Sequence, residues 1–350
     1  MTGAEDGVRA AVRQHGPLPF SEVVELALYD SATGFYATGG QAGRRGDFLT
    51  SPEVGPLFGA VVARALDTWW REAGEPDVWT VVEAGAGPGT LARAVLAAAP
   101  DCKDALRYVL VERSAAQREL HPAGVESLAE LPDATDEPVV VLANELLDNL
   151  PFDVFEMTDD GWAELRVAMR GEDLVGVLVP TFPEPIDRLA PDAPLGARVP
   201  VQRAACDWLR SALALAGVDG RVVVFDYGTS TADLASRPVE EWLRTYRAHQ
   251  RGGHPLEHLG EQDITVEVAL DQLAEVHAPV SDLSQAEWLT EHGIRELVEE
   301  GRRVWNERAS IGDLAAVRGR SRLTERDALL HPEGMGAFRV VEWNGTLSTG

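Results

Sequence analysis

One short segment limits what this chain can fold into. An apolar, β-branched run from Trp79 to Glu83 leads directly into E-A-G-A-G-P-G-T-L, and residues 92–99 then follow with helical spacing. A strand, a glycine turn and a helix in this order place backbone N–H groups and a helix amino terminus beside a bound cofactor. The segment predicts an α/β fold with a Rossmann-like core and an adenosine-type cofactor.

The spacing of the glycines narrows the choice of cofactor. Gly85, Gly87 and Gly89 form G-x-G-x-G, and Thr90 stands where the dinucleotide fingerprint G-x-G-x-x-G requires glycine. No G-K-[ST] follows, which excludes a nucleoside triphosphate loop. S-adenosylmethionine (SAM) has no phosphate to cradle, and glycines allow its methionine moiety to approach closely. The pattern favours SAM over a nicotinamide or flavin cofactor, with a purely structural turn as the third reading.

Two acidic residues agree with SAM. Glu83 ends the strand before the turn, where a carboxylate can sit near the ammonium group of the methionine moiety. Glu112 follows a second short strand, about 23 residues after Gly89. An acidic side chain at such a strand tip can accept hydrogen bonds from both ribose hydroxyls of an adenosine cofactor.

A third strand places polar residues at the same edge. V-V-V-L-A is a continuous apolar run, typical of a parallel strand buried on both faces, and it ends at Asn144. Since ligands of open α/β sheets lie beyond the carboxyl ends of strands, N-E-L-L-D-N-L-P is expected to meet the methyl acceptor. Glu145 and Asp148 can project from one face of the following turn. The alternative is that both only cap and solvate that turn.

A further buried strand over residues 222–225 puts Asp226 and Tyr227 at the active-site edge. Beyond it, residues 229–262 are polar and contain His249, His254 and His258. Without a firm helix to align these histidines, they suit a substrate loop or a solvated surface better than a metal site, so no metal is predicted.

The remaining segments suggest additions to the core. Helical spacing covers residues 4–15 and 20–29, and a long turn-rich segment follows over 30–59, of the kind that compact domains keep when it binds something. Short β-like pieces over 152–200 predict an antiparallel insertion, and the part after residue 262 is expected to be helical until the last strand, F-R-V-V-E-W. The expected division is an N-terminal helical and lid region, 1–76; a discontinuous core, 77–151 and 218–350; and an inserted β/helical subdomain, 152–217.

Charge and composition restrict the partners. The 350 residues carry a net charge of −26, which disfavours a nucleic-acid substrate and favours a cationic or arginine-rich partner. The alternative explanation of the acidic composition is that it only serves solubility or reflects a compositional bias of the genome. Cys102 and Cys206 offer neither a disulfide framework nor a metal knuckle. No apolar stretch reaches the roughly 18 residues of a membrane span and no secretory signal is visible, so a cytoplasmic location without membrane attachment is expected.

Several motifs together resemble one family. G-D-F-L-T-S-P-E-V-G-P-L-F-G, E-A-G-A-G-P-G-T-L, A-N-E-L-L-D-N-L-P, D-Y-G, L-R-T-Y-R-A-H, D-I-T-V-E-V and M-G-A-F-R-V-V occur in order from about Pro19 to Val341. In this set and order they resemble the MidA family of SAM-dependent methyltransferases, which is related to the mitochondrial complex I assembly factor that methylates an arginine. The first and third motifs are specific to that family, whereas the glycine loop is shared by many methyltransferases.

The resemblance implies a class I methyltransferase core, a helical amino-terminal cap closing over the cofactor, and a small antiparallel β insertion. It also implies a protein substrate, with a respiratory complex I subunit as one candidate. The sequence leaves the oligomeric state open, with a homodimer as one option. Carried over by position, the cofactor-binding residues are Gly46, Asp47, Phe48, Thr50, Pro52, Glu83, Gly85, Gly87, Gly89, Thr90 and Asn144, to which the spacing adds Glu112, and the substrate-binding residues are Tyr227, Tyr246 and His249.

The chemistry of methyl transfer selects candidates for catalysis. If the acceptor is a guanidinium, it stays protonated in water, and carboxylates must hold it and orient the attacking nitrogen. The candidates are Glu145, which adjoins the strand tip and ranks first, and Asp148, Glu53 and Asp226. Two alternatives stay open: a small-molecule O- or N-methyltransferase, with His249 or His254 as general base, and a non-catalytic assembly factor that keeps the fold.

Overall fold

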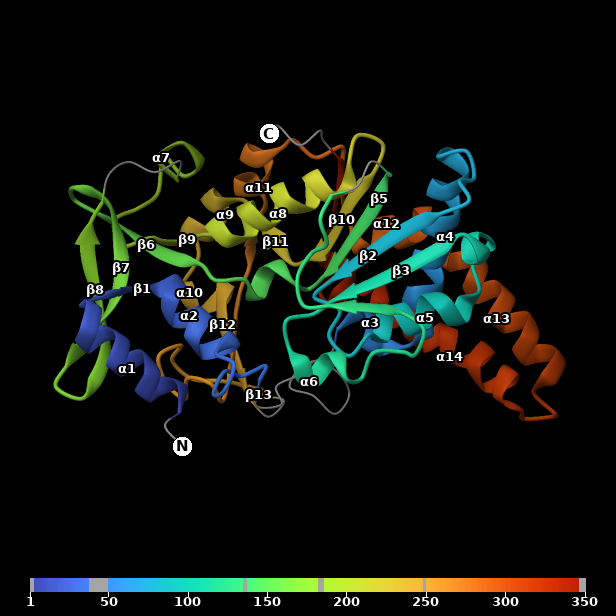
Figure 1. Cartoon of the computed structure of the whole chain (residues 1–350), viewed down its shortest axis with the longest axis horizontal. Helices are drawn as coiled ribbons and strands as arrows, with labels where there is room; N and C mark the ends of the chain where they lie inside the picture. Colours follow the sequence, from blue (N-terminus) through green and yellow to red (C-terminus); the bar gives the residue numbers. More distant parts are fainter. Residues whose placement is uncertain (1–2, 38–49, 135–136, 182–185, 248–249, 346–350) are drawn as a thin grey trace. The chain divides into compact units, whose positions relative to one another are not determined.

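The computed structural model describes residues 3–37, 50–134, 137–181, 186–247 and 250–345 (Figure 1). Its contacts divide the chain into two compact units. The first unit comprises residues 1–48, 146–211 and 227–278, and the second comprises 49–145, 212–226 and 279–350. Residues 49–76 thus group with the predicted core, and 227–278 group with the predicted insertion.

The second unit is built on a seven-stranded sheet with the strand order β16-β17-β10-β5-β2-β3-β4. The five strands from β10 to β4 run parallel, whereas β17 pairs antiparallel with β10, and β16 antiparallel with β17. The strands are β2 (Trp79–Ala84), β3 (Leu106–Val111), β4 (Glu126–Leu128), β5 (Val139–Asn144), β10 (Arg221–Asp226), β16 (Ser281–Ser284) and β17 (Arg339–Asn344). The parallel arrangement confirms the predicted α/β core and brings the carboxyl ends of β2, β3, β5 and β10 to one edge.

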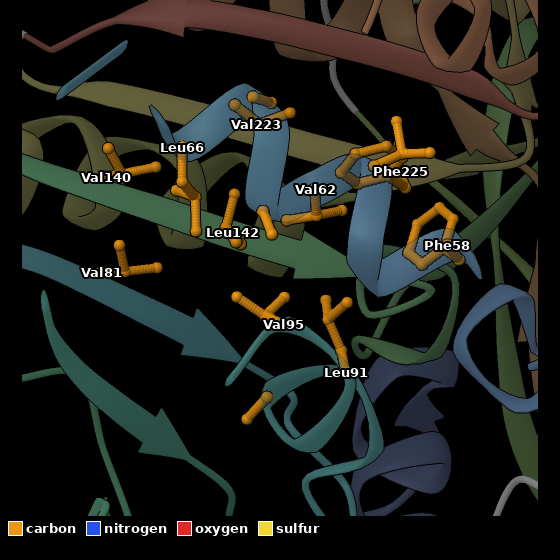
Figure 2. Close-up of a cluster of buried hydrophobic side chains, with 14 of the residues drawn as sticks. Phe58, Val62, Leu66, Val81, Leu91, Val95, Val140, Leu142, Val223 and Phe225 are labelled. Carbon is orange, nitrogen blue, oxygen red and sulfur yellow. The ribbon is translucent and has the colours of Figure 1, made fainter. Parts of the chain in front are cut away.

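Valine and leucine dominate the central strands because both faces of the sheet are covered. Two helices share one face, α4 (Pro56–Glu72) and α5 (Thr90–Ala98). Figure 2 shows Phe58 and Val62 of α4 beside Val95 of α5, directed toward the side chains of the strands. The ring of Phe58 meets that of Phe225 edge to face, with centroids 5.3 Å apart. This packing fixes the start of α5, and with it the glycine loop, against the sheet.

Shorter elements surround this core. In the second unit they are α3 (Ser51–Val54), η1 (Asp101–Asp104), α6 (Ala115–Arg118) and η3 (Met335–Ala337). A C-terminal group adds α12 (Gln285–Glu291), α13 (Ile294–Arg308) and α14 (Leu314–Leu329). α13 and α14 pack closely where Gly301 faces Gly319, since a Cβ at Gly319 would lie 2.5 Å from the carbonyl oxygen of Gly301.

The first unit contains the predicted antiparallel insertion. β1 (Leu18–Pro19), β7 (Gly161–Arg170), β6 (Asp153–Thr158) and β9 (Arg198–Val201) lie side by side in that order, and β8 (Asp173–Pro180) pairs with β7. The helices α1 (Ala4–His15) and α2 (Phe20–Tyr29) begin and end as the sequence predicted. Their apolar faces share a core with β6, β7 and the segment from 234 to 269.

The rest of the first unit contains short elements. A three-stranded sheet has the order β13-β12-β14, and β11 pairs parallel with β15. These elements are β11 (Gly228–Thr229), β12 (Leu243–Arg247), β13 (Gln250–Arg251), β14 (Asp263–Val266) and β15 (Val268–Ala269), with η2 (Leu147–Asn149), α7 (Ile186–Leu189), α9 (Thr231–Ala235), α10 (Val239–Trp242) and α11 (Leu270–Val276). Helix α8 (Arg203–Ala216) has residues in both units.

One expectation was wrong. The part of the chain after residue 262 is not helical throughout, because β14, β15 and β16 precede the last strand. The β-branched residues of D-I-T-V-E-V pair with β12, and S-D-L-S pairs with β17. Both pairings join segments distant in the chain, where packing overrides weak local preference. Among the described residues, no helix is long and apolar enough to cross a membrane.

Candidate functional site

The glycine loop between β2 and α5 takes the conformation that its sequence requires. Gly85, Gly87 and Gly89 all have positive φ, at 66°, 53° and 77°, which only glycine adopts without cost. The N–H of Gly87 donates to Oε2 of Glu112 over 3.0 Å, and its carbonyl oxygen lies 2.9 Å from Nε2 of His121. The loop is therefore held from both sides at its middle glycine.

Glu112 lies just beyond β3, where the sequence placed it. Its second oxygen, Oε1, accepts the N–H of Ser114 over 2.8 Å, and Arg118 donates to its backbone carbonyl over 2.6 Å. A carboxylate has about four acceptor positions, and the two backbone bonds use two of them. Glu112 can therefore still accept hydrogen bonds from a ribose diol.

His121 was not among the predicted site residues. Because Nε2 faces a carbonyl oxygen, it carries the hydrogen, and Nδ1, 2.8 Å from the hydroxyl of Ser127, accepts. A histidine just after α6 gives no sequence signal of its own. Its proximity to Gly87 depends on how the turn after α6 folds back onto the loop.

Glu83 is buried, with 4% of its surface exposed. The hydroxyl of Tyr108 donates to its Oε2 over 2.7 Å. Burial raises the pKa of Glu83 to about 7, and the bond from Tyr108 opposes this. The structure thus gives Glu83 a partner on β3, and its contact with the cofactor ammonium stays a prediction.

The tip of β5 presents Asn144 and Glu145. Nδ2 of Asn144 donates to Oε1 of Glu145 over 3.1 Å, while Oδ1 of Asn144 is buried and has no hydrogen-bond partner among the described residues. A buried acceptor without a donor is costly, and the ammonium group of a methionine moiety is a donor of the required kind. Asn144 therefore fits a SAM site.

Glu145 has a left-handed backbone with φ of 51°, which is uncommon for a residue with a long side chain. Its N–H donates to the carbonyl oxygen of Phe225 in β10 over 2.8 Å, which holds the turn. Residues kept in sparsely populated conformations gather at active sites. The turn aims the Glu145 carboxylate at α3, where Oε1 accepts the N–H of Ser51 over 3.1 Å.

The T-S-P-E motif forms the start of α3. Oε1 of Glu53 accepts the hydroxyl of Thr90, the first residue of α5, over 2.6 Å. Thr50 and Pro52, neighbours of Glu53 in the chain, are buried. Three predicted residues of this motif thus lie in one short helix and its cap, and the structure joins Glu53 to the glycine loop. Gly46, Asp47 and Phe48 lie outside the described residues.

Asp226 ends β10 in the second unit, with 1% of its surface exposed. In the first unit, Oδ2 of Asp148 accepts the hydroxyls of Tyr227 over 2.7 Å and of Thr265 over 2.8 Å. Burial raises the pKa of Asp148, and these two bonds oppose it. The predicted acceptor-side carboxylates therefore divide between the two units, with Glu53, Glu145 and Asp226 in the second.

A second buried carboxylate in the first unit, Asp263, was missed by the sequence reading. Its Oδ1 accepts from Nδ2 of Asn149 over 3.0 Å and from the hydroxyl of Tyr36 over 3.2 Å. Burial, followed by the charge of Asp148, raises its pKa to about 7. D-I-T-V-E-V was predicted only as a family motif, and its first residue places a second carboxyl group in the same buried region as Asp148.

The remaining candidates belong to the first unit or lie outside the described residues. Tyr246 lies in β12, half-buried, opposite Asp263 of β14 in the strand register. His249 lies outside the described residues. Nδ1 of His254 accepts the N–H of Leu256, and His258 is exposed beside Glu261. Across the described ranges, no group of three or more histidine, cysteine or acidic residues could hold a metal ion.

Comparison with known proteins identifies the family. Residues 61–286, more than half of the chain, match the model of a family described as "putative S-adenosyl-L-methionine-dependent methyltransferase". The chain belongs to this family. The resemblance to MidA methyltransferases is thereby confirmed, and so is SAM as the cofactor.

Solved structures agree over the whole chain. A crystal structure from Burkholderia thailandensis bound to S-adenosyl-homocysteine is 26% identical, with a TM-score of 0.83, and the match covers 99% of this chain and 95% of that one. A native structure from the same organism is 25% identical, with a TM-score of 0.79 and coverage of 99% and 94%. These matches support the class I, Rossmann-like methyltransferase core.

Curated relatives match over a shorter stretch. The Drosophila melanogaster "Protein arginine methyltransferase NDUFAF7 homolog, mitochondrial" is 28% identical over 195 residues, 47% of this chain and 45% of the relative. The Bos taurus protein arginine methyltransferase NDUFAF7 is 27% identical over 188 residues, 45% of this chain and 43% of the relative. The matches thus span less than half of the length of these relatives.

The geometry of the second unit fits SAM. The glycine turn leaves room for the methionine moiety, Glu112 offers acceptors for the ribose, and Asn144 offers a buried acceptor to the ammonium group. These residues are the candidate cofactor site of this member of the SAM-dependent methyltransferase family.

Proposed function

We propose that this methyltransferase transfers a methyl group to an arginine side chain of a protein. The observation that carries the proposal is the constrained carboxylate of Glu145 at the tip of β5, next to Asn144 in the candidate cofactor site. The names of the curated relatives support the same acceptor. A net charge of −26 also favours a cationic partner.

The chemistry follows from the state of the acceptor. Bound SAM supplies a methyl group on a positively charged sulfur, an excellent leaving group. A guanidinium has a pKa above about 12 and stays protonated, so the protein must orient one of its nitrogens rather than deprotonate it beforehand. Glu145 accepts an N–H of the guanidinium and thereby turns the neighbouring nitrogen toward the methyl group. The surplus proton leaves the methylated nitrogen for Glu145 or water.

The orientation of the Glu145 carboxylate follows from the bonds to Oε1. Oε1 accepts the N–H of Ser51 and Nδ2 of Asn144, each over 3.1 Å. These bonds set the plane of the carboxylate and hence the direction of Oε2. Glu145 would therefore present its carboxylate to the guanidinium in a fixed orientation.

The test is methylation of an array of acetylated, amidated peptides that each contain one arginine, with matched arrays carrying lysine or citrulline. Methyl groups from labelled SAM should enter arginine peptides only. Glu145→Gln should lower kcat while the Kd for SAM stays the same, because the amide keeps the shape of the side chain and loses its charge. Unchanged methylation by Glu145→Gln would remove Glu145 from this role.

A cell extract then separates the competing acceptors. The family resemblance makes a subunit of respiratory complex I the first protein to assay, and the label should appear in the protein fraction. Label confined to small molecules would instead support an O- or N-methyltransferase of small acceptors. Binding of SAM without any transfer would support an assembly factor that keeps the fold.

A further inference from the structure

We infer that Gln285 is a positioning residue for methyl transfer, acting on Glu145 through Ser51. The inference rests on the role proposed for Glu145. All three residues belong to the second unit, so the contacts that link them lie within one compact body. Gln285 is the first residue of α12, and 234 positions in the sequence separate it from Ser51.

The first link joins Gln285 to Ser51. Both side chains are fully buried, with 0% exposure, and the hydroxyl of Ser51 donates to Oε1 of Gln285 over 3.0 Å. The orientation of the amide is fixed independently, because Nε2 of Gln285 donates to the carbonyl oxygen of Leu329 over 3.3 Å. Oε1 must therefore face Ser51, and the serine must be the donor.

The second link joins Ser51 to Glu145. Ser51 is the first residue of α3, so its N–H has no partner within the helix. This N–H donates to Oε1 of Glu145 over 3.1 Å. A shift of Ser51 would move the donor that sets the plane of the Glu145 carboxylate. Gln285 controls that shift because it holds the side chain of the same residue.

The backbone of Gln285 is itself hydrogen-bonded to the segment that leads into β17. Its N–H donates to the carbonyl oxygen of Phe338, next to β17, over 2.7 Å. α12 also begins with a capping box between Ser284 and Glu287, which fixes its amino terminus. A rigid helix start thus carries the amide, and a short α3 of four residues depends on contacts of this kind to keep its place.

Two other side-chain contacts stabilise α3 and the helix that follows it, but at other positions. Glu53 bonds to Thr90, and Oε2 of Glu325 accepts the N–H of Leu57 at the start of α4 over 2.9 Å. These contacts hold the middle of α3 and the helix that follows it. Among these side-chain contacts, the one from Gln285 reaches the residue whose N–H binds Glu145.

Two variants break the link between Gln285 and Ser51 without changing the charge of the protein or its backbone. Gln285→Met keeps the length of the side chain without its amide, and Ser51→Ala removes the hydroxyl and keeps the N–H. Each should lower kcat about ten-fold for the arginine peptide that the array methylates fastest, since small misplacements of an orienting group cost this much or more. The Kd for SAM should change less than two-fold, and the double variant should be no slower than the slower single one.

A double-mutant cycle that combines Gln285→Met with Glu145→Gln distinguishes a positioning role of Gln285 from a general loss of folding. If Gln285 acts through Glu145, adding Gln285→Met to Glu145→Gln lowers kcat no further. The matched control is Thr290→Ala, which removes a hydroxyl that donates to the carbonyl oxygen of Ala286 in the same helix over 2.7 Å and leaves the cap and the bond to Ser51 intact. It should keep wild-type kcat, so an equal loss in this control would overturn the inference.

The outcomes also separate this inference from the function on which it rests. An inactive Glu145→Gln together with a fully active Gln285→Met would overturn the inference and leave the proposed role of Glu145 standing. An unchanged Glu145→Gln would remove the proposed role itself. A crystal structure of Gln285→Met provides a test without any acceptor: a Glu145 carboxylate that keeps its bond to Ser51 would overturn the positioning role.

Discussion

The contact of Glu112 with the cofactor can be tested by changing its carboxylate to an amide. In Glu112→Gln a single oxygen replaces the two that accept the N–H groups of Gly87, over 3.0 Å, and Ser114, over 2.8 Å. One of these N–H groups then faces an NH2 group, and one acceptor for the ribose is lost. Hydrogen bonds to charged groups are worth about 1.5–3 kcal/mol each.

The loss in SAM affinity should be about 2 kcal/mol, or about thirty-fold in Kd, since about 1.4 kcal/mol corresponds to a factor of ten. Isothermal titration calorimetry with SAM and with S-adenosyl-homocysteine measures it, and both ligands should weaken equally because both carry the ribose. Glu126→Gln is the matched control. Glu126 lies on the adjacent strand β4, exposed, and pairs with Arg107 over 2.7 Å, a surface contact of little energetic worth.

A wild-type Kd in Glu112→Gln would refute the reasoning, because the ribose would then be bound elsewhere. An equal loss in Glu126→Gln would refute it too, since the effect would then reflect general charge rather than a contact. The unfolding temperature of each variant, measured without ligand, checks that the loop keeps its fold.

Three further predictions concern the loop, the core and the pH dependence of stability. His121→Phe removes a bond to the carbonyl of Gly87 and should weaken SAM binding by about 1 kcal/mol, measured by calorimetry. Gly59→Ala would place a Cβ 2.3 Å from Cβ of Ala94 and should destabilise the protein by about 1–3 kcal/mol in urea unfolding. The pKa of Asp263 is raised from 3.8 to about 7, so the folded state binds an extra proton between these values, and its contribution to stability falls as pH rises from 4 to 7. Thermal unfolding should therefore show a higher Tm at pH 5.5 than at pH 8, and Asp263→Asn should reduce the difference; an unchanged difference would contradict the assignment.

The sequence was most informative where chemistry and secondary structure coincide. The strand, the glycine loop and the helix from Trp79 onward needed only local spacing to predict, and Glu112 followed from its place beyond the next strand. The parallel core was predictable for the same reason, since the valine-rich runs of β5 and β10 are typical of strands buried on both faces. Periodicity and turn chemistry suffice for such elements.

The contacts between distant segments were not predictable in this way. Gln285 and Ser51 meet only because α12 packs beside α3, and Asp263 is buried because β14 pairs with β12. S-D-L-S has no strong β preference, and it forms β16 because β17 offers a partner edge. Local sequence does not encode which segments come together. From the sequence alone, a buried amide or carboxylate in such a segment therefore cannot be distinguished from an ordinary surface residue.

The backbone of Glu145 is where structure and proposed chemistry bear on each other most directly. A left-handed conformation costs an L-residue roughly 1–2 kcal/mol, and glycine would remove that cost. The strain is maintained because the N–H of Glu145 bonds to Phe225 and its carboxylate bonds to Ser51 and Asn144. A turn that only had to connect β5 to the next segment would need no such side chain. The cost therefore argues that the carboxylate itself is required at the strand tip, beside the residues that fit the cofactor.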